Sequence, residues 1–426
     1  MHSRLAIPTV EDYEPFIGQQ AVDRILTKGR LLAGRSVAHV NSTYFGGGVA
    51  EILSSLTLLM RSLGLAAEWR IIQGPPDFFS ITKKMHNALQ GAPIRLTDIK
   101  KEIYEEVVFQ NALRNRFDHD YVVAHDPQPL PLVRFSRRRG PWIWRCHIDM
   151  AQPSQEIWEY LSQYIEQYNA VIISAEEYRQ PWQVPQFAFQ PAIDPFSILN
   201  RELPEGEVDR RLHHYGVPTD LPLVVQISRF DRWKDPHGVI RAFQIARRQR
   251  DCTLVLVGNV AADDPEGPEV YESLLNAREE RILIISNEDT SFVNALQRRA
   301  AVVVQKSLRE GFGLTVSEAM WKRTPVIGGN VGGIRYQIDD GVNGFLVSSV
   351  EETADRIALL LSDEGLRRRM GEAAHEKVRQ RFLMTRYLEQ YLDLLGGFET
   401  HYRLRPEVMA MAVEGARAES ERPVTH

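Results

Sequence analysis

Apolar residues recur along the chain in two alternating patterns. Short runs of β-branched and other apolar residues predict strands, and apolar positions three and four apart predict helices between them. In the first half of the chain, the predicted strands cover residues 37–40, 68–72, 121–124, 142–147 and 170–174. The predicted helices between them cover residues 49–63, 101–117 and 157–168. Strands that alternate with helices in this way indicate an α/β fold with a parallel sheet covered on both faces.

The same alternation restarts in the second half, after a segment of different composition. Residues 186–204 show little periodicity and carry Pro191, Pro195 and Pro204, so they predict a linker. Beyond it, strands are predicted at residues 223–227, 253–257, 282–285, 301–305, 325–327 and 345–347. Two similar sheets joined by a proline-bearing hinge predict a cleft between two lobes.

Both ends of the chain differ from this pattern. An amphipathic stretch at 16–32 predicts a helix outside the first sheet, and a closing helix is predicted at about 372–395. The closing helix places apolar residues near one face, namely Val378, Phe382, Tyr387, Tyr391 and Leu395. Residues 403–426 lack a core pattern and are expected to be disordered.

Composition narrows the class of protein. The chain has 426 residues, which suggests two or three domains, and its hydrophobic share of 43% is ordinary for a globular protein. It has no apolar run of about 20 residues and no apolar segment near its start, so neither a membrane span nor a secretory signal is expected. Cys146 lies in the strand predicted at 142–147 and Cys252 directly before the one at 253–257, and the lack of a disulfide framework favours a reducing, cytoplasmic setting. A net charge of −5 argues against nucleic acid as a partner.

The densest group of chemically useful residues follows the strand at 301–305. Glu310, Gly311 and Gly313 lie in a glycine turn, and Glu318 lies in the helix that the turn leads into, predicted at 314–322. Such a turn directs unpaired backbone N–H groups and a helix N-terminus at a ligand, most often a phosphate. A carboxylate there can accept hydrogen bonds from sugar hydroxyls. On these residues alone, an exposed loop acid followed by an acid in the first helical turns remains an alternative.

Two cations follow the strand at 223–227. Arg229 and Lys234 are five residues apart, just past the carboxyl end of the strand, which is where open α/β sheets bind ligands. A planar guanidinium beside an ammonium is suited to holding a pyrophosphate.

Further candidate residues lie at the strand ends of the first half. Gly46, Gly47 and Gly48 follow the first strand, but they lack the spacing of a dinucleotide fingerprint. The pairs His125-Asp126 and His147 with Asp149 end two later strands, and a structural role is the alternative for each. Their spacing does not gather three or more metal ligands, so no metal site is predicted.

Taken together, Arg229, Lys234, Glu310 and Glu318 resemble the donor site of retaining glycosyltransferases of family four, which have the GT-B fold. The resemblance extends from about residue 36 to about residue 395. Segments 41–51, 125–128 and 144–149, together with 310–321, are similar to the trehalose glycosyltransferring synthases.

The resemblance implies two Rossmann-like parallel-sheet domains that face each other across a cleft. Residues 1–195 would form the acceptor domain, joined by the C-terminal crossing helix at about 372–400, and residues 205–371 would form the nucleotide-sugar donor domain. An Asp-x-Asp pattern at 118–120 is the one that metal-dependent glycosyltransferases of another fold use. Here it precedes a strand, which favours a pair of turn acids.

The activity that the resemblance implies is the transfer of glucose from ADP-, UDP- or GDP-glucose to free glucose. The product would be α,α-trehalose, formed with retention, reversibly, and with no essential cofactor or metal. Catalytic roles would fall to Arg229, Lys234, Glu310 and His147. The donor would be bound by Gly46, Gly47, Gly48, Arg229, Lys234, Gly311, Phe312, Gly313, Leu314 and Glu318. The acceptor would be bound by Tyr44, Glu51, His125, Asp126 and Asp149.

Several alternatives stay open from the sequence. A GT-B epimerase, a trehalose phosphorylase, or a GT-B hexosyltransferase with another acceptor would use the same cleft. A non-catalytic nucleotide-sugar sensor is an alternative of another class. The base is expected near residues 287–289, which do not distinguish uridine from adenosine. The direction of the reaction and a homodimeric assembly are also left open.

Overall fold

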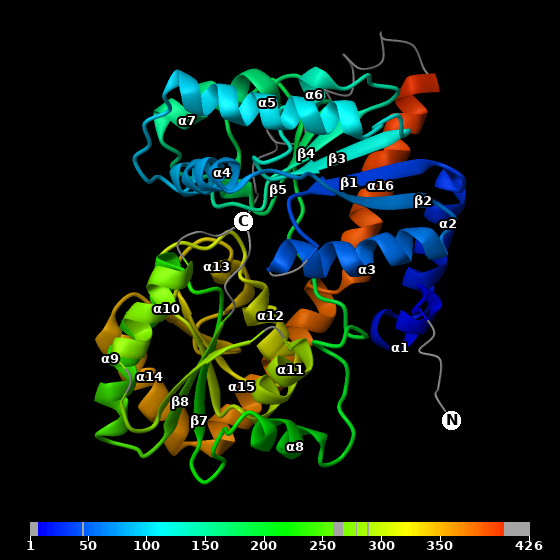
Figure 1. The fold of residues 1–426 in the computed structure, drawn as a ribbon. Helices are drawn as coiled ribbons and strands as arrows, with labels where there is room; N and C mark the ends of the chain where they lie inside the picture. Colours follow the sequence, from blue (N-terminus) through cyan, green and yellow to red (C-terminus); the bar gives the residue numbers. More distant parts are fainter. Residues whose placement is uncertain (1–6, 45–46, 259–266, 278, 288, 404–426) are drawn as a thin grey trace, which may run out of the picture.

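The protein has two lobes, each built on a six-stranded parallel sheet (Figure 1). The structure is a computed structural model that describes residues 7–44, 47–258, 267–277, 279–287 and 289–403. Both sheets are covered by helices on their two faces, as the alternating sequence pattern requires.

The first sheet has the strand order β2-β1-β3-β4-β5-β6. Its strands are β1 (Ser36–Asn41), β2 (Ala66–Ile71), β3 (Tyr121–His125), β4 (Trp142–Arg145), β5 (Ala170–Ile173) and β6 (Gln186–Ala188). One face packs against α4 (Pro76–Leu89), α5 (Asp98–Arg114), α6 (Leu132–Phe135) and α7 (Gln155–Ile165). The other face packs against α2 (Gln19–Leu32), α3 (Gly48–Ser62) and α16 (Met384–Arg403). Strands covered on both faces read as continuous apolar runs, as β3 and β5 do.

The second sheet has the order β12-β11-β10-β7-β8-β9. Its strands are β7 (Leu223–Ile227), β8 (Thr253–Gly258), β9 (Ile282–Ser286), β10 (Val302–Gln305), β11 (Val326–Gly329) and β12 (Gly344–Val347). On one face lie α9 (Pro236–Arg247), α10 (Gly267–Asn276) and α14 (Val350–Ser362). On the other lie α8 (Glu207–His214), α11 (Thr290–Arg299), α12 (Leu314–Trp321) and α15 (Glu364–Arg381).

Each sheet has one point at which the chain reverses its direction of winding. In the first sheet this point lies between β1 and β3, and in the second it lies between β7 and β10. Loops that leave two such strands diverge to opposite faces and open a crevice at the carboxyl ends. The fold thereby creates a ligand-binding position in each lobe.

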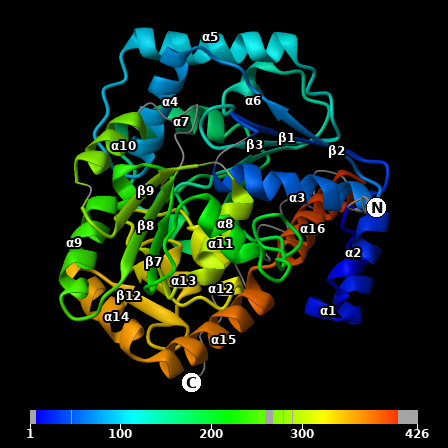
Figure 2. The ribbon, with the colours of Figure 1, turned by 60° about the horizontal axis from the view of Figure 1, so that its bottom comes forward.

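The two lobes are connected twice, and the two connections pair with each other. The Ile193 N–H donates to the Phe382 carbonyl at 2.8 Å, and the Met384 N–H donates to the Ile193 carbonyl at 2.9 Å. After this contact α16 runs back along the first lobe beside α2 and α3 (Figure 2). It buries Tyr387 and Tyr391 there. The final helix is therefore part of the first lobe.

The structure differs from the predicted elements in several places, and the helix predicted at 16–32 is one of them, because Gly18 divides it into α1 and α2. Residues 186–188 of the expected linker form β6, which pairs with β5. The single closing helix predicted at 372–395 is divided, because α15 ends at Arg381 and packs on the second lobe before α16 begins. Helix α4 was not predicted. Residues 404–426, most of the expected disordered tail, lie outside the described residues.

The short elements are η1 (Glu11–Tyr13), α1 (Glu14–Ile17), η2 (Glu176–Tyr178), η3 (Arg232–Lys234) and α13 (Ile334–Gln337). In the described part of the chain, no helix combines the length and the apolar character that crossing a membrane requires.

Candidate active site

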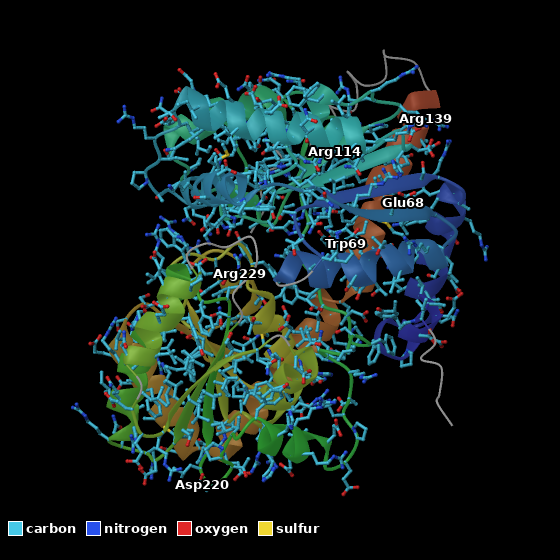
Figure 3. All side chains as sticks on the ribbon, in the orientation of Figure 1. Glu68, Trp69, Arg114, Arg139, Asp220 and Arg229 are labelled. Carbon is cyan, nitrogen blue, oxygen red and sulfur yellow. The ribbon has the colours of Figure 1, made fainter. Side chains whose placement is uncertain are left out.

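The carboxyl ends of both sheets border one cleft of about 490 Å³ between the lobes. Figure 3 shows Asp220 and Arg229 at opposite ends of β7, with Arg229 at the end that faces the first lobe. The sequence-predicted residues that line the cleft are Tyr44, Gly47, Gly48, Glu51, His125, Asp126, His147, Arg229, Lys234, Glu310, Gly311, Phe312, Gly313, Leu314 and Glu318. Gly46 lies outside the described residues, and Asp149 is not among the lining residues.

The cations after β7 are held by a short, capped turn. The Asp231 carboxylate accepts the Trp233 N–H at 2.8 Å, and the Gln226 amide donates to the Lys234 carbonyl at 2.8 Å. The Lys234 Nζ lies 2.5 Å from Oε2 of Glu310, which follows β10. Arg229 borders the same space. Lys234, after β7, thus contacts Glu310, after β10. The two strands are neighbours at the point where the winding of the sheet reverses.

The loop that carries Glu310 is fixed by close backbone contacts. A Cβ on Gly311 would lie 2.0 Å from the His147 carbonyl oxygen, so a larger residue would push the lobes apart. Gly313 has a φ of 84° and starts α12 from the left-handed region. The Tyr178 hydroxyl lies 3.2 Å from the carbonyl oxygens of both Glu310 and Gly311 and donates to them. The loop therefore belongs to the second lobe but is shaped by the first.

Glu318 lies in the second turn of α12 and is buried. Gln297 donates to its carboxylate at 3.4 Å, and Lys322 lies one turn further along. Burial raises the pKa of Glu318, and the Lys322 ammonium partly offsets this. Burial also lowers the pKa of Lys322 to about 7. Glu318 lines the cleft beside the N-terminus of α12.

On the first lobe, the N-terminus of α3 faces the same space. Helix α3 starts from Gly47, and Gly48 packs so closely on Leu314 that a Cβ there would lie 2.7 Å from that side chain. Burial, the charge of Glu318 and that of Asp194 raise the pKa of Glu51 to about 7. The N-termini of α3 and α12 thus border one cleft, and both direct backbone N–H groups toward it.

Three imidazole rings from three elements form a hydrogen-bonded row. His39 Nδ1 lies 3.0 Å from His125 Nε2, and His125 Nδ1 lies 3.0 Å from His147 Nε2. Both ring nitrogens of His125 are thereby occupied, so its predicted role in binding acceptor hydroxyls has no free ring atom. His147 lines the cleft at the end of the row. His39 was not singled out in the sequence, because a lone histidine inside a strand gives no pattern.

The carboxylates of Asp126 and Asp149 accept hydrogen bonds from backbone N–H groups at and near His147. Asp126 has a φ of 62°, and its carboxylate accepts the His147 N–H at 2.7 Å. The Asp149 carboxylate accepts the Ala151 N–H at 3.0 Å and lies 3.9 Å from Arg309. The structure thus places Asp149 in a turn, outside the residues that line the cleft.

Helix α4 and the residue that follows it contribute cleft residues that were not predicted from the sequence. His86 and Gln90 line the cleft, and the Lys83 Nζ contacts the Asp231 carboxylate of the other lobe at 3.2 Å with both side chains buried. Burial and the charges of Lys83 and Arg229 lower the pKa of His86 to about 3. A signal was present, because Pro75-Pro76-Asp77 is a typical helix start.

The acids of the Asp-x-Asp pattern lie away from the cleft. Asp120 accepts hydrogen bonds from the backbone and side chain of Ser36, both at 2.9 Å, which fits the predicted turn role. His119 lies 3.4 Å from Glu68. No group of three or more histidine, cysteine or acidic side chains with metal-binding geometry occurs among the described residues.

Two family descriptions match the chain. Residues 39–180 match "Trehalose synthase, N-terminal domain", and residues 210–377 match "Glycosyl transferases group 1". A trehalose synthase of Pyrococcus horikoshii is 44% identical over 91% of this chain and 95% of its own. A trehalose phosphorylase of Pleurotus pulmonarius is 27% identical over 87% of this chain and 58% of its own.

The fold has solved counterparts as well. Anabaena HepE in complex with UDP-glucose superposes with a TM-score of 0.65 at 18% identity, over 85% of this chain and 100% of that one. The predicted GT-B fold is confirmed by this likeness and by the two parallel sheets. The match to the trehalose synthase extends over nearly the whole of both chains at 44% identity. It therefore shows common family membership as well as a common fold. The chain belongs to the trehalose synthase family of GT-B glycosyltransferases, and it is an enzyme of the hexosyltransferase type.

Proposed function

We propose that the protein transfers glucose from a nucleotide-glucose to free glucose and releases α,α-trehalose with retention of the α configuration. The observation that carries this proposal is the contact between Lys234 and Glu310 at 2.5 Å, beside Arg229, in the cleft between the lobes. It combines cations for a diphosphate with an acid for sugar hydroxyls in one place. The UDP-glucose complex of a protein with this fold supports a nucleotide-sugar as the donor class.

The donor would bind mainly to the second lobe. Arg229 and Lys234 would contact the diphosphate, and the N-terminus of α12 would add backbone N–H donors. When the phosphate takes up Lys234, the Glu310 carboxylate becomes available to sugar hydroxyls. Glu318 would accept hydrogen bonds from the ribose.

Leaving-group departure places negative charge on the terminal phosphate of the nucleotide. Cations that are already in position stabilise that charge without reorganising during the reaction. Holding the acceptor hydroxyl against the anomeric carbon supplies the entropic contribution. In this proposal the two cations supply the positive charge, and no metal is required.

Retention is assigned to attack from the face that the leaving group departs from. A double displacement needs a carboxylate that is free to act as a nucleophile. Glu310 is held by Lys234 and by the Ser307 hydroxyl at 3.1 Å, and Asp126 is held by the His147 N–H. A phosphate oxygen of the leaving group would accept the proton of the attacking hydroxyl.

The test is an incubation of the protein with glucose and ADP-, UDP- or GDP-glucose in turn, with products resolved by chromatography and NMR. We expect trehalose with both anomeric centres in the α configuration and one equivalent of nucleoside diphosphate. Adding the diphosphate to trehalose should regenerate nucleotide-glucose. A β-linked product would contradict retention, and the absence of any glycosyl transfer would favour the sensor.

A phosphorylase is the second candidate, and the 27% identical relative is the observation that favours it. The distinguishing incubation contains trehalose and inorganic phosphate without nucleotide. Formation of glucose 1-phosphate would replace the proposed function with phosphorolysis. We expect none.

A further inference from the structure

The row of His39, His125 and His147 extends the candidate site into the core of the first lobe. His39 lies on β1, His125 ends β3, and His147 follows β4. His39 and His125 are buried, and the His125 and His147 rings are stacked at 17° with centroids 5.3 Å apart. Residues of three adjacent strands thus reach from the winding reversal of the sheet to the cleft.

The surroundings keep the three rings uncharged. Burial lowers the pKa of His39 to about 3, and burial together with the neighbouring rings lowers the pKa of His125. The Arg145 guanidinium is fully buried in the same layer and adds to the effect on His147. The relevant question is therefore which nitrogen of each ring carries its single proton.

The two contacts link the three rings into one tautomeric state. A neutral imidazole has one donor and one acceptor, so each contact requires a donor on one side and an acceptor on the other. Either all three rings are protonated on Nδ1, or all three are protonated on Nε2. His147 lines the cleft, and its second ring nitrogen, Nδ1, is an N–H donor in the first state and a bare acceptor in the second.

The buried end of the row distinguishes the two states. His39 Nε2 is inaccessible to solvent and has no hydrogen-bond partner among the described residues. Protonation on Nε2 would leave a buried N–H without an acceptor, which is rarer in proteins than an unsatisfied acceptor. The state with every proton on Nδ1 avoids this. Because His39 Nε2 has no partner, the row cannot pass a proton to solvent through its buried end. Its effect is therefore to fix a tautomer and not to conduct protons.

We propose that His39 and His125 are positioning residues that hold His147 as a neutral ring protonated on Nδ1, with this N–H directed at a hydroxyl oxygen of the transferred hexose. Only the identity of the oxygen rests on the proposed function. The tautomer is a property of the protein without substrate, and Asp126 supports it by fixing the backbone of His147 at 2.7 Å.

The test measures the tautomer of His147 directly. The protein is labelled with ¹⁵N-histidine, and two-bond ¹H–¹⁵N correlations are recorded without substrate near neutral pH. The His147 signals are those that disappear in His147→Gln. We expect the wild-type ring to be neutral with its proton on Nδ1. An Nε2–H ring, or an even mixture of the two, would overturn the proposal, and this measurement needs no variant of His39.

Variants of His39 test the coupling along the row. His39→Leu removes the group opposite His125 Nε2, so we expect His147 to become a mixture of tautomers, and kcat of glucose transfer to fall by about fivefold to tenfold. His39→Asn restores an N–H donor near the position of Nδ1. It should recover most of the Nδ1–H tautomer of His147 and most of the wild-type kcat. Binding of the nucleoside diphosphate alone should be unchanged.

The matched control is His119→Leu, which removes another buried histidine of the first lobe, outside the row. It should leave the His147 signals and kcat unchanged. An unaltered His147 tautomer in a folded His39→Leu variant would contradict the coupling. If wild-type protein shows the Nδ1–H ring but transfers no glucose, the proposed function fails while the positioning role stands.

Discussion

On the second lobe, the cleft is lined by charges in direct contact, such as Lys234 and Glu310 at 2.5 Å. On the first lobe it is lined by His125 and His147 of the imidazole row and by Glu51, whose pKa burial raises to about 7. The difference fits the proposed function, in which the second lobe would hold a diphosphate and the first lobe a sugar. A diphosphate brings its own charge and needs cations in position, whereas a sugar needs neutral or weakly charged groups that accept and donate hydrogen bonds. Mutations on the two lobes should therefore change different measured properties of the enzyme.

Removing the cation on the charged side should have the largest effect. Lys234→Ala is expected to lower kcat by about 10²-fold to 10³-fold, because one preorganised group that stabilises the leaving phosphate is lost. Initial rates with saturating nucleotide-glucose measure this.

The matched control is Lys377→Ala, which removes a lysine that pairs with Asp339 at 2.7 Å outside the cleft residues. This variant should keep wild-type kcat. A Lys234→Ala enzyme with a raised KM and an unchanged kcat would show that the cation only binds the donor.

On the first lobe, the raised pKa of Glu51 should make the free energy of unfolding depend on pH. Its pKa is raised from an ordinary value of 4.5 to about 7, so the folded state holds the proton to higher pH than the unfolded state. The folded state therefore binds more protons between these values, and stability falls as the pH rises through this window. Full ionisation costs at most about 3 kcal/mol.

Glu51→Gln should remove this cost. We expect its stability to exceed that of the wild type at about pH 8 and to match it at about pH 4, as measured by denaturant unfolding at both values. Glu11→Gln, an exposed acid outside the cleft, is the control. Equal stability gains at both pH values would contradict the assignment to ionisation.

Glu318 connects the two sides, since its charge contributes to the raised pKa of Glu51. Glu318→Ala should weaken nucleotide-sugar binding by about 10-fold to 100-fold, the loss expected for a hydrogen bond to a charged group. Titration calorimetry with the nucleotide-glucose measures this, and the KM should rise in parallel. Unchanged donor affinity would refute the ribose role. Glu352→Ala, in the first turn of α14, serves as the control.

The second lobe was more predictable from sequence than the first. Arg229 with Lys234, and Glu310 with Glu318, each lie close together in the chain and directly after a strand, so local patterns reveal them. Their meeting across β7 and β10 follows from the strand order, which the sequence does not specify.

The first lobe depends more on distant contacts. His39 and His125 are 86 residues apart and meet only because β1 and β3 are neighbours. The break between α15 and α16 was missed because Phe382 and Leu383 continue the apolar pattern while their backbone pairs with Ile193. Residues 186–188 form an edge strand too short to show a period. Tertiary pairing therefore decides features that local periodicity cannot reveal.

The smallest effect is expected at the exposed rim of the first lobe. The Tyr44 hydroxyl donates to the Trp69 carbonyl at 3.1 Å, and the two rings pack edge to face at 4.9 Å, although Tyr44 is 47% exposed. Tyr44→Phe keeps the ring contact and loses only a solvent-accessible hydrogen bond, so the acceptor KM should rise by no more than about threefold, with kcat unchanged. Tyr44→Ala also loses the ring and should raise the KM further. Initial rates at varied glucose separate the two variants, and a large fall in kcat for Tyr44→Phe would show that the hydroxyl acts in the reaction itself and that the rim is not merely a binding surface.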